Sequence, residues 1–261
     1  MCIRDRAKGE LAEEMAADGC LFLNADDPRV AAMRGKAKCA VRTFGFAPDA
    51  DVRAESVRMA AGRTSFTCAA GGWRRTFTLP LLGRHNVHNA LAAIAVGTEL
   101  GLAPEALQAG IDALEPTPMR LEARCAGGVT IINDAYNASP ASMRAAVEVL
   151  AEAAPGRKFA ALGDMLELGG QAEALHAAVG ELLAARGVNA VVTVGKLASH
   201  IAAKAASLGV AAYACEDCDQ AASQLKSLLR SGDTVLVKGS RGMRMERVAE
   251  RLLAADALQQ A

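Results

Sequence analysis

The nine residues INDAYNASP, at positions 132–140, decide how the second half of this 261-residue chain folds. The apolar segment at residues 129–132 runs into this stretch and predicts a buried strand that ends in polar side chains. Ser139 and Pro140 have the pattern of an N-cap and a first helical residue, so we expect a helix to follow. Polar groups at the carboxyl end of a strand commonly face a ligand crevice, although the same residue types also form ordinary turns.

Strands and helices alternate from this stretch to the end of the chain. We expect strands at 129–133, 158–162, 190–194, 210–214 and 234–238, and helices at 140–153, 172–186, 197–208, 218–229 and 243–255. This alternation predicts an α/β fold with a doubly wound, mainly parallel sheet.

The first half of the chain has a different pattern. We expect a helix over residues 7–17 and a βαβ-like unit with strands at 21–24 and 40–44. Period-two alternation then predicts an antiparallel β meander between residues 51 and 79, followed by helices that end near residues 100 and 114. Residues 115–118 (EPTP) are the best linker, and residues 1–6 are a candidate non-native leader.

The composition excludes several classes of protein. Lys plus Arg and Asp plus Glu number 29 each, and aromatic residues make up 3%, so neither a basic surface nor base stacking indicates a nucleic-acid partner. No apolar run is long enough for a membrane span, and the first residues lack the apolar segment of a signal peptide, so we expect a cytoplasmic protein.

The seven cysteines predict reduced, mostly buried thiols, because their number is odd and no export signal accompanies them. Only Cys215 and Cys218 form a CxxC pair, and no second pair or suitably spaced histidines follow it. The acidic residues around this pair should raise the pKa of both thiols, which argues against a redox role.

Two nucleotide-binding motifs do not occur in the sequence. It contains no Gly-x-Gly, and the two Gly-Lys pairs, at 35–36 and 195–196, are not followed by Ser or Thr as a phosphate loop requires. Either the protein does not handle a nucleoside triphosphate, or its phosphate loop lies upstream of residue 1.

A polar helix start favours the second choice. His85, Asn86, His88 and Asn89 crowd the first turn of a predicted helix, where an amide could cap the helix or pair with an adenine edge. No carboxylate accompanies the histidines, so they are weak evidence for a metal site.

Five ordered motifs carry a resemblance to a known family. They are GRHNVHNALAA (83–93), MRLE (119–122), INDAYNASPASM (132–143), LGDMLELG (162–169) and VKGSRGMRMERV (237–248). In this order and spacing the chain resembles the ATP-dependent Mur ligases of peptidoglycan synthesis. Its motifs are most similar to the branch that adds D-alanyl-D-alanine (D-Ala-D-Ala) to UDP-N-acetylmuramoyl-tripeptide (UDP-MurNAc-tripeptide).

The resemblance implies part of a three-domain enzyme. Residues 1–118 would be the remainder of the central ATP-binding α/β domain, with its β meander, and residues 119–261 the Rossmann-like C-terminal domain. The N-terminal UDP-binding domain and the phosphate loop would lie outside the sequence, and the chain alone would be inactive.

The resemblance also assigns roles to residues. Asn86 and Asn89 would contact adenine, with His85 shaping the turn, while Arg120 and Asp134 would approach the phosphates and ribose. Tyr136 and Asn137 would border the reacting carboxylate as catalytic residues. The dipeptide's carboxylate would be bound by three residues that follow one predicted strand: Lys238, Ser240 and Arg241.

Lys8 lies in a segment that resembles the place where Mur ligases have a carbamylated lysine. Such a modification would turn a cation into an anion that helps to hold Mg²⁺, although an ordinary solvated lysine is also compatible with the sequence. The chain departs from the family pattern at three positions: Met119, where Gly is frequent before the Arg; Asn133, where an acidic residue is common; and Ser139, where Asn is common.

We therefore expect a monomeric ligase of the α/β class that uses ATP and Mg²⁺ to join D-Ala-D-Ala to UDP-MurNAc-tripeptide through an acyl phosphate. The alternatives are another amino-acid ligase of the same family and a non-catalytic protein that binds a nucleotide or peptide.

Overall fold

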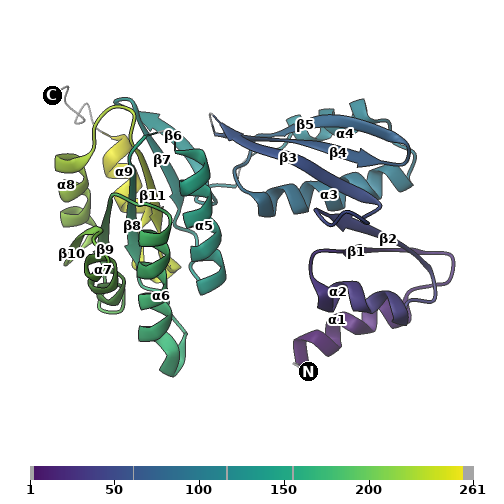
Figure 1. Cartoon of the computed structure of the whole chain (residues 1–261), viewed down its shortest axis with the longest axis horizontal. Coiled ribbons are helices and arrows are strands. Elements are labelled where there is room, and N and C mark those ends of the chain that lie inside the picture. Colours follow the sequence, from purple (N-terminus) through teal and green to yellow (C-terminus); the bar gives the residue numbers. More distant parts are fainter. Residues whose placement is uncertain (1–2, 61, 116, 155, 255–261) are drawn as a thin grey trace. The chain divides into compact units, whose positions relative to one another are not determined.

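The computed structural model describes residues 3–60, 62–115, 117–154 and 156–254, and for residues 3–8 it describes the backbone alone. Two compact units divide the chain: one holds the described residues among 1–59, 63–80 and 84–115, the other those among 60–62, 81–83 and 116–261. Figure 1 shows the elements of each unit along the chain. Pro116, in the predicted linker, is outside the described residues, and our boundary between residues 118 and 119 stays a prediction.

The first unit is built on a five-stranded sheet in the order β1-β2-β3-β4-β5. The strands are β1 (Cys20–Asn24), β2 (Ala40–Gly45), β3 (Val52–Ala60), β4 (Arg63–Ala70) and β5 (Trp73–Leu79). β1 and β2 pair in parallel around α2 (Pro28–Ala31) and a 3-10 turn at Ala32–Lys36, as the predicted βαβ-like unit requires. The antiparallel pairing of β4 and β5 agrees with the predicted meander. β3 lies beside β4 in the sheet, and on its other edge it pairs with β2 in parallel.

Three more helices belong to this unit: α1 (Ile3–Glu14), α3 (Arg84–Glu99) and α4 (Pro104–Asp112). The buried face of α3 includes Val87, Leu91 and Ile94. Phe66 of β4 and Phe77 of β5 are buried, with ring centroids 5.9 Å apart. The helix predicted from residue 7 begins earlier, at Ile3, and includes part of the stretch that we treated as a leader.

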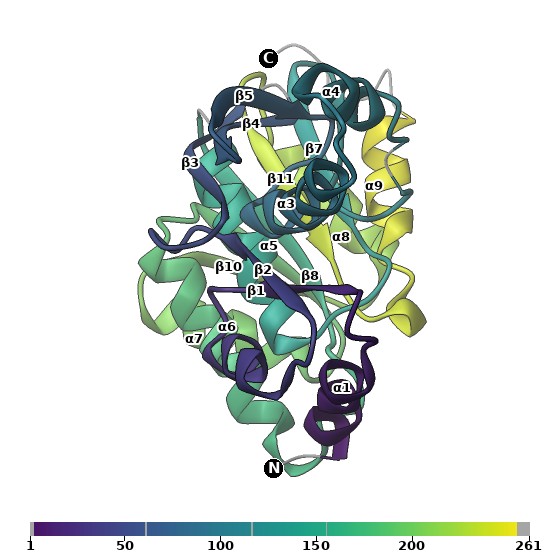
Figure 2. The same ribbon diagram turned by 90° about the vertical axis from the view of Figure 1, so that its right-hand side faces the viewer.

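The second unit contains a six-stranded sheet in the order β10-β9-β8-β11-β7-β6. The strands are β6 (Glu122–Ala126), β7 (Val129–Asp134), β8 (Lys158–Gly163), β9 (Ala190–Val194), β10 (Ala211–Cys215) and β11 (Thr234–Lys238). The last strand in the sequence, β11, lies between β7 and β8 and pairs with both in parallel (Figure 2). The edge strand β6 was not predicted, and it is the only antiparallel strand in the described part of this sheet.

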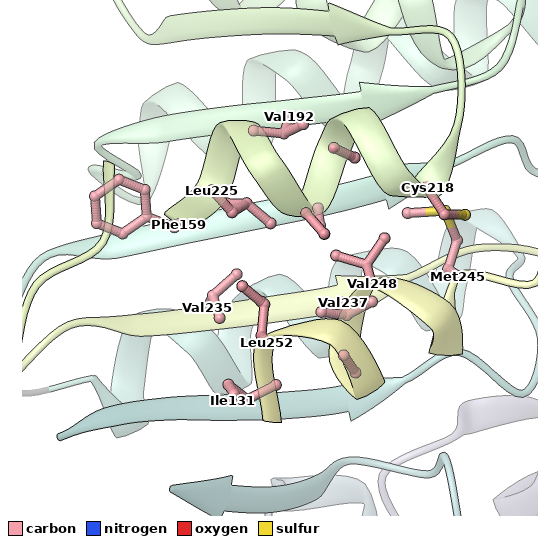
Figure 3. Packing of buried hydrophobic residues seen from close by; sticks show 14 of the residues in the cluster. Ile131, Phe159, Val192, Cys218, Leu225, Val235, Val237, Met245, Val248 and Leu252 are labelled. Atoms are coloured by element: carbon pink, nitrogen blue, oxygen red, sulfur yellow. The ribbon is translucent and has the colours of Figure 1, made fainter. Parts of the chain in front are cut away.

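Helices cover both faces of this sheet. α5 (Pro140–Ala153), α6 (Ala172–Ala185) and α7 (Ala198–Ser207) lie on one face, and α8 (Cys218–Leu228) and α9 (Glu246–Leu253) lie on the other (Figure 1). Leu225 of α8 and Leu252 of α9 point onto strand side chains such as Val235 and Ile131 (Figure 3). The predicted α/β class and doubly wound sheet are confirmed.

Local signals explain where α5 and α9 begin. Ser139 accepts a hydrogen bond from the Ser142 amide and Pro140 is the first helical residue, so the predicted cap of α5 is confirmed. The helix predicted from residue 243 begins instead at Glu246, because a 3-10 turn at Arg241–Met243 ends in Arg244 with a left-handed φ of 52°.

Candidate functional site

A cavity of about 590 Å³ opens in the second unit, beyond the carboxyl ends of β7, β8 and β11. This is the edge of a doubly wound sheet where ligands bind. Its volume is within the usual range for small-molecule sites. The lining residues come from three separate segments: Tyr136, Asn137, Ala138 and Ser139; Leu166, Glu167 and Leu168; and Ser240, Arg241 and Gly242.

Lys238 lies beneath this cavity and does not line it. Its side chain is 2% exposed, and its ammonium nitrogen is 2.6 Å from Asp134 Oδ2 and 2.8 Å from the carbonyl oxygen of Asn137. A third, longer contact of 3.4 Å reaches the carbonyl oxygen of Asp134. An ammonium group has three protons to donate, so these acceptors satisfy it.

In this structure Lys238 is therefore held by groups of the chain itself, and its predicted contact with the substrate carboxylate stays a prediction. The lysine and Asp134 are partners across neighbouring strands, so the ion pair fastens β11 to the end of β7, and the contact with the Asn137 carbonyl reaches the loop that follows. Asp134 also accepts a hydrogen bond from the Leu121 amide at 3.2 Å. Its role toward ribose stays a prediction, but in this structure the carboxylate orders the backbone around the cavity.

Ser240 holds the part of the cavity lining that residues 166–168 form. Its buried hydroxyl accepts a hydrogen bond from the Leu166 amide at 2.9 Å, and its own amide donates to the carbonyl oxygen of Asp164 at 3.0 Å. Asn137 turns its side-chain oxygen to the amide of Ala138, at 2.8 Å, which shapes the loop before α5. Both residues line the cavity, and their predicted contacts with substrate stay predictions.

Arg241 is the cation that lines the cavity. Its side chain is 57% exposed, and Nη1 lies 3.0 Å from Glu246 Oε1. The Glu246 carboxylate therefore orients the Arg241 guanidinium at the cavity, and the guanidinium stays exposed to solvent. A guanidinium presented in this way suits a carboxylate ligand, because it can form two parallel hydrogen bonds.

Arg120 and Tyr136 form a second polar group beside the cavity. The Arg120 guanidinium lies over the tyrosine ring, 4.1 Å from its centroid, and the tyrosine amide donates to the Met119 carbonyl at 3.2 Å. Met119 and Leu121, on either side of the arginine, both have left-handed backbones, with φ of 59° and 52°. Glycine adopts this conformation without strain, whereas the side chains of Met119 and Leu121 make it unfavourable.

The predicted adenine-binding residues lie in the first unit, in the opening turns of α3. His85 and Asn86 are the second and third residues of this helix. Asn86 therefore lies within the helix and is not its N-cap residue, which would precede the first helical residue. Asn89 Nδ2 donates to Asn86 Oδ1 at 3.3 Å, so the two amides lie side by side. Their roles toward adenine, and that of His85, stay predictions.

Sequence reasoning missed a cluster next to this helix start. His88 Nε2 is 2.6 Å from Asp26 Oδ2, and the His88 ring meets the Phe46 ring edge-on at 4.6 Å. The Arg84 guanidinium also lies over the Phe46 ring, 4.1 Å from its centroid. The polar loop after β1 was visible in the sequence, but its partners at residues 46, 84 and 88 come from distant segments.

Asp26 is the anionic centre of this cluster. Burial alone would raise its pKa, but hydrogen bonds from the amides of Phe46 and Ala47 and from His88 hold the pKa below its ordinary value. The charged carboxylate therefore fixes the loop after β2 against the start of α3.

Three other predictions concern metals and thiols. Lys8 lies in α1, but its side chain is outside the described ones, so the predicted carbamylation stays a prediction. The pKa values of Cys215 and Cys218 are raised, as predicted; burial is the main cause, and acidic neighbours such as Asp217 add to it. Among the residues that the structure describes, no three His, Cys, Asp or Glu side chains gather as metal ligands, and the predicted use of Mg²⁺ stays a prediction.

No helix among the described residues has both the length and the apolar character needed to cross a bilayer.

Known proteins resemble the chain in both sequence and structure. The family model of the Mur ligase middle domain matches residues 5–97, and that of the Mur ligase glutamate ligase domain matches residues 119–241. The UDP-N-acetylmuramoyl-tripeptide--D-alanyl-D-alanine ligase of Bacillus subtilis is 37% identical over 95% of this chain and 54% of that protein. The ligase of the same name from Escherichia coli is 36% identical over 95% of this chain and 55% of that protein.

Solved structures agree with these matches. MurF from Acinetobacter baumannii aligns with a TM-score of 0.82 and 29% identity, covering 96% of this chain and 55% of that one. MurF from Thermotoga maritima, solved in complex with ADP, aligns with a TM-score of 0.81 and 25% identity, covering 97% and 57%. The chain therefore spans about half the length of the relatives that it matches.

Proposed function

The chain belongs to the Mur ligase family, and we propose that it contributes the acceptor site and the adenine-binding residues of an ATP-dependent ligase that adds D-Ala-D-Ala to UDP-MurNAc-tripeptide. The names of its relatives support this branch of the family. Such a ligase would act in the cytoplasm, where ATP and the nucleotide-linked precursor are found. Its predicted monomeric state can be measured by light scattering.

One observation carries the proposal: three motifs that lie far apart in the sequence line one cavity. Residues 136–139 form one wall, residues 166–168 another, and residues 240–242 the third. Each wall belongs to a stretch that resembles the D-Ala-D-Ala-adding branch. The lining residues include one guanidinium, one carboxylate, one side-chain amide, three hydroxyl groups and two leucine side chains. Such a cavity suits a small peptide with a free carboxylate and a free amine.

The proposed reaction has two steps. The terminal carboxylate of the tripeptide attacks the γ-phosphorus of ATP, which forms an acyl phosphate and releases ADP. The amine of D-Ala-D-Ala then attacks the acyl carbon, loses a proton and expels inorganic phosphate, leaving the new amide bond. Catalysis of such a transfer depends mainly on positioning and on offsetting charge.

The described residues divide these tasks. Asn86 and Asn89 would hold adenine, and Arg120 would offset phosphate charge from its position over Tyr136. Arg241 would bind the dipeptide carboxylate, with its direction set by Glu246. Mg²⁺ remains part of the proposal, where it would offset phosphate charge, and we assign it no step.

The test uses the complete gene product that contains these residues. ADP release is measured with ATP and UDP-MurNAc-tripeptide while the acceptor is varied among D-Ala-D-Ala, D-glutamate and a diamino acid. Turnover that depends on D-Ala-D-Ala supports the proposal. Preference for a single amino acid would assign the chain to another ligase of the family, and nucleotide binding without turnover would favour the non-catalytic alternative.

Arg241→Leu tests the acceptor site within this assay. We expect a Michaelis constant for D-Ala-D-Ala raised by about tenfold to a hundredfold, with that for ATP unchanged, since a charged hydrogen bond contributes about 1.5–3 kcal/mol. Arg244→Leu is the matched control, because Arg244 does not line the cavity. Equal effects of the two variants would contradict the assignment.

A further inference from the structure

His176 is a buried imidazole that the proposed reaction does not use. It lies in α6 and is 0% exposed. Its Nε2 is 2.9 Å from the Met165 amide nitrogen, and its Nδ1 is 2.6 Å from the carbonyl oxygen of Ala172. Because a backbone amide only donates and a carbonyl only accepts, Nε2 must be unprotonated and Nδ1 must carry the proton. The two contacts thus define one neutral tautomer.

The segment held by this ring is a wall of the cavity. Leu166, Glu167 and Leu168 line the cavity directly after Met165. Two successive amides anchor this wall: that of Met165 bonds to the imidazole, and that of Leu166 bonds to Ser240 Oγ at 2.9 Å. Within the wall Glu167 has a left-handed backbone, with φ of 64°. A non-glycine residue keeps this conformation only where its surroundings fix it.

We propose that His176, in its Nδ1-protonated neutral form, is a positioning residue that fixes residues 166–168 as the wall of the acceptor site. It acts on the affinity for the acceptor and not on the chemical steps. The inference rests on the proposed function, because it takes the cavity to be the site of the dipeptide.

The physical reason is the burial of the Met165 amide. The Met165 side chain is fully buried, so a missing acceptor would leave its amide without a partner in the interior. An unpaired buried amide is strongly unfavourable, and the backbone would shift to find another acceptor. Such a shift would release the strained backbone of Glu167, two residues after Met165, and would change the shape of the cavity.

Two substitutions separate the two hydrogen bonds of the ring. His176→Asn places a donor near the position of Nδ1, within reach of the Ala172 carbonyl, but has no acceptor that reaches Met165. His176→Gln places an acceptor near the position of Nε2. We expect His176→Asn to raise the Michaelis constant for D-Ala-D-Ala by about tenfold with kcat and the constant for ATP nearly unchanged, and His176→Gln to raise it by less than about threefold.

Two measurements do not depend on turnover. Nitrogen NMR of the complete protein labelled in its histidine rings should show the His176 proton on Nδ1. Hydrogen exchange at the Met165 amide should be slow in the wild type and in His176→Gln, and at least about tenfold faster in His176→Asn. Thermal unfolding of each variant controls for a general loss of stability.

The outcomes are distinct. A proton on Nε2, unchanged exchange at Met165 in His176→Asn, or equal kinetic effects of the two variants would overturn the inference. If instead the wild type lacks turnover with D-Ala-D-Ala, the proposed function fails, while tautomer and exchange still decide whether His176 fixes this wall.

Discussion

Lys238→Met is the substitution that tests the geometry beneath the cavity most directly. Methionine keeps most of the length and apolar volume of lysine but removes the ammonium group, which is 2.6 Å from Asp134 Oδ2. The carboxylate would remain mostly buried without its cation, and two carbonyl oxygens would lose a donor. Removing one partner of a buried ion pair destabilises by about 3–5 kcal/mol, so we expect a loss in this range for the second unit.

The assay is hydrogen exchange of amides in β11 and β7, which reports the free energy of opening of this sheet separately from the first unit. Asp134→Asn added to Lys238→Met should recover about 1–2 kcal/mol, because the double variant no longer buries an unpaired charge. Lys158→Met is the matched control, since Lys158 lies at the other end of the neighbouring strand β8 and its ammonium group makes one long contact, of 3.4 Å, to the Arg186 carbonyl. A loss below about 1 kcal/mol for Lys238→Met, or no recovery in the double variant, would refute the reasoning.

Four further predictions follow from other sites. Met119→Gly should stabilise the protein by about 0.5–1 kcal/mol in urea unfolding, because glycine relieves the left-handed backbone at φ 59°; Met119→Ala keeps a Cβ and should bring no gain. Asp26 has a lowered folded-state pKa, so its contribution to stability should be complete above its unfolded value of 3.8 and be lost as the pH falls through the lower folded value; Asp26→Asn should flatten this acid limb of the stability profile, and an unchanged limb would count against it. Asn89→Ala should raise the Michaelis constant for ATP and leave that for D-Ala-D-Ala unchanged, and an unaltered ATP constant would remove Asn89 from the adenine site. Lys8→Ala should lose most activity in the complete gene product and regain part of it with an added small carboxylic acid, whereas full activity without the additive would make Lys8 an ordinary surface residue.

Local signals in the sequence predicted much of the second unit. Ser139 and Pro140 marked the start of α5, and its predicted span of 140–153 agrees with the structure. The strands β7, β8, β9 and β11 were predicted within one residue, because apolar runs bounded by turn residues are typical of buried parallel strands. β6 was missed because its sequence, EARCA, carries two charges and lies at the exposed edge of the sheet.

The role of Lys238 could not be predicted in the same way. Its neighbours depend on strand order, which places β11 beside β7 and brings Lys238 opposite Asp134 although 104 residues separate them. The sequence therefore could not show that Asp134 and the carbonyl oxygen of Asn137 are the partners of Lys238 in the fold. His176 was missed for a related reason: its partner, Met165, lies outside its own helix, and nothing in the sequence of α6 indicates that this histidine is fully buried.

The position of β11 has a consequence for synthesis of the protein on the ribosome. Chains emerge from their N-terminal end, and β11 is the last strand of the second sheet to leave the exit tunnel, yet it fills the gap between β7 and β8. Until it arrives, the facing edges of β7 and β8 have no partner, and the cavity lacks the wall formed by residues 240–242. We expect a nascent chain stalled before residue 234 to be sensitive to proteases and attractive to chaperones, whereas one with residues 117–254 outside the tunnel should become resistant in a single step.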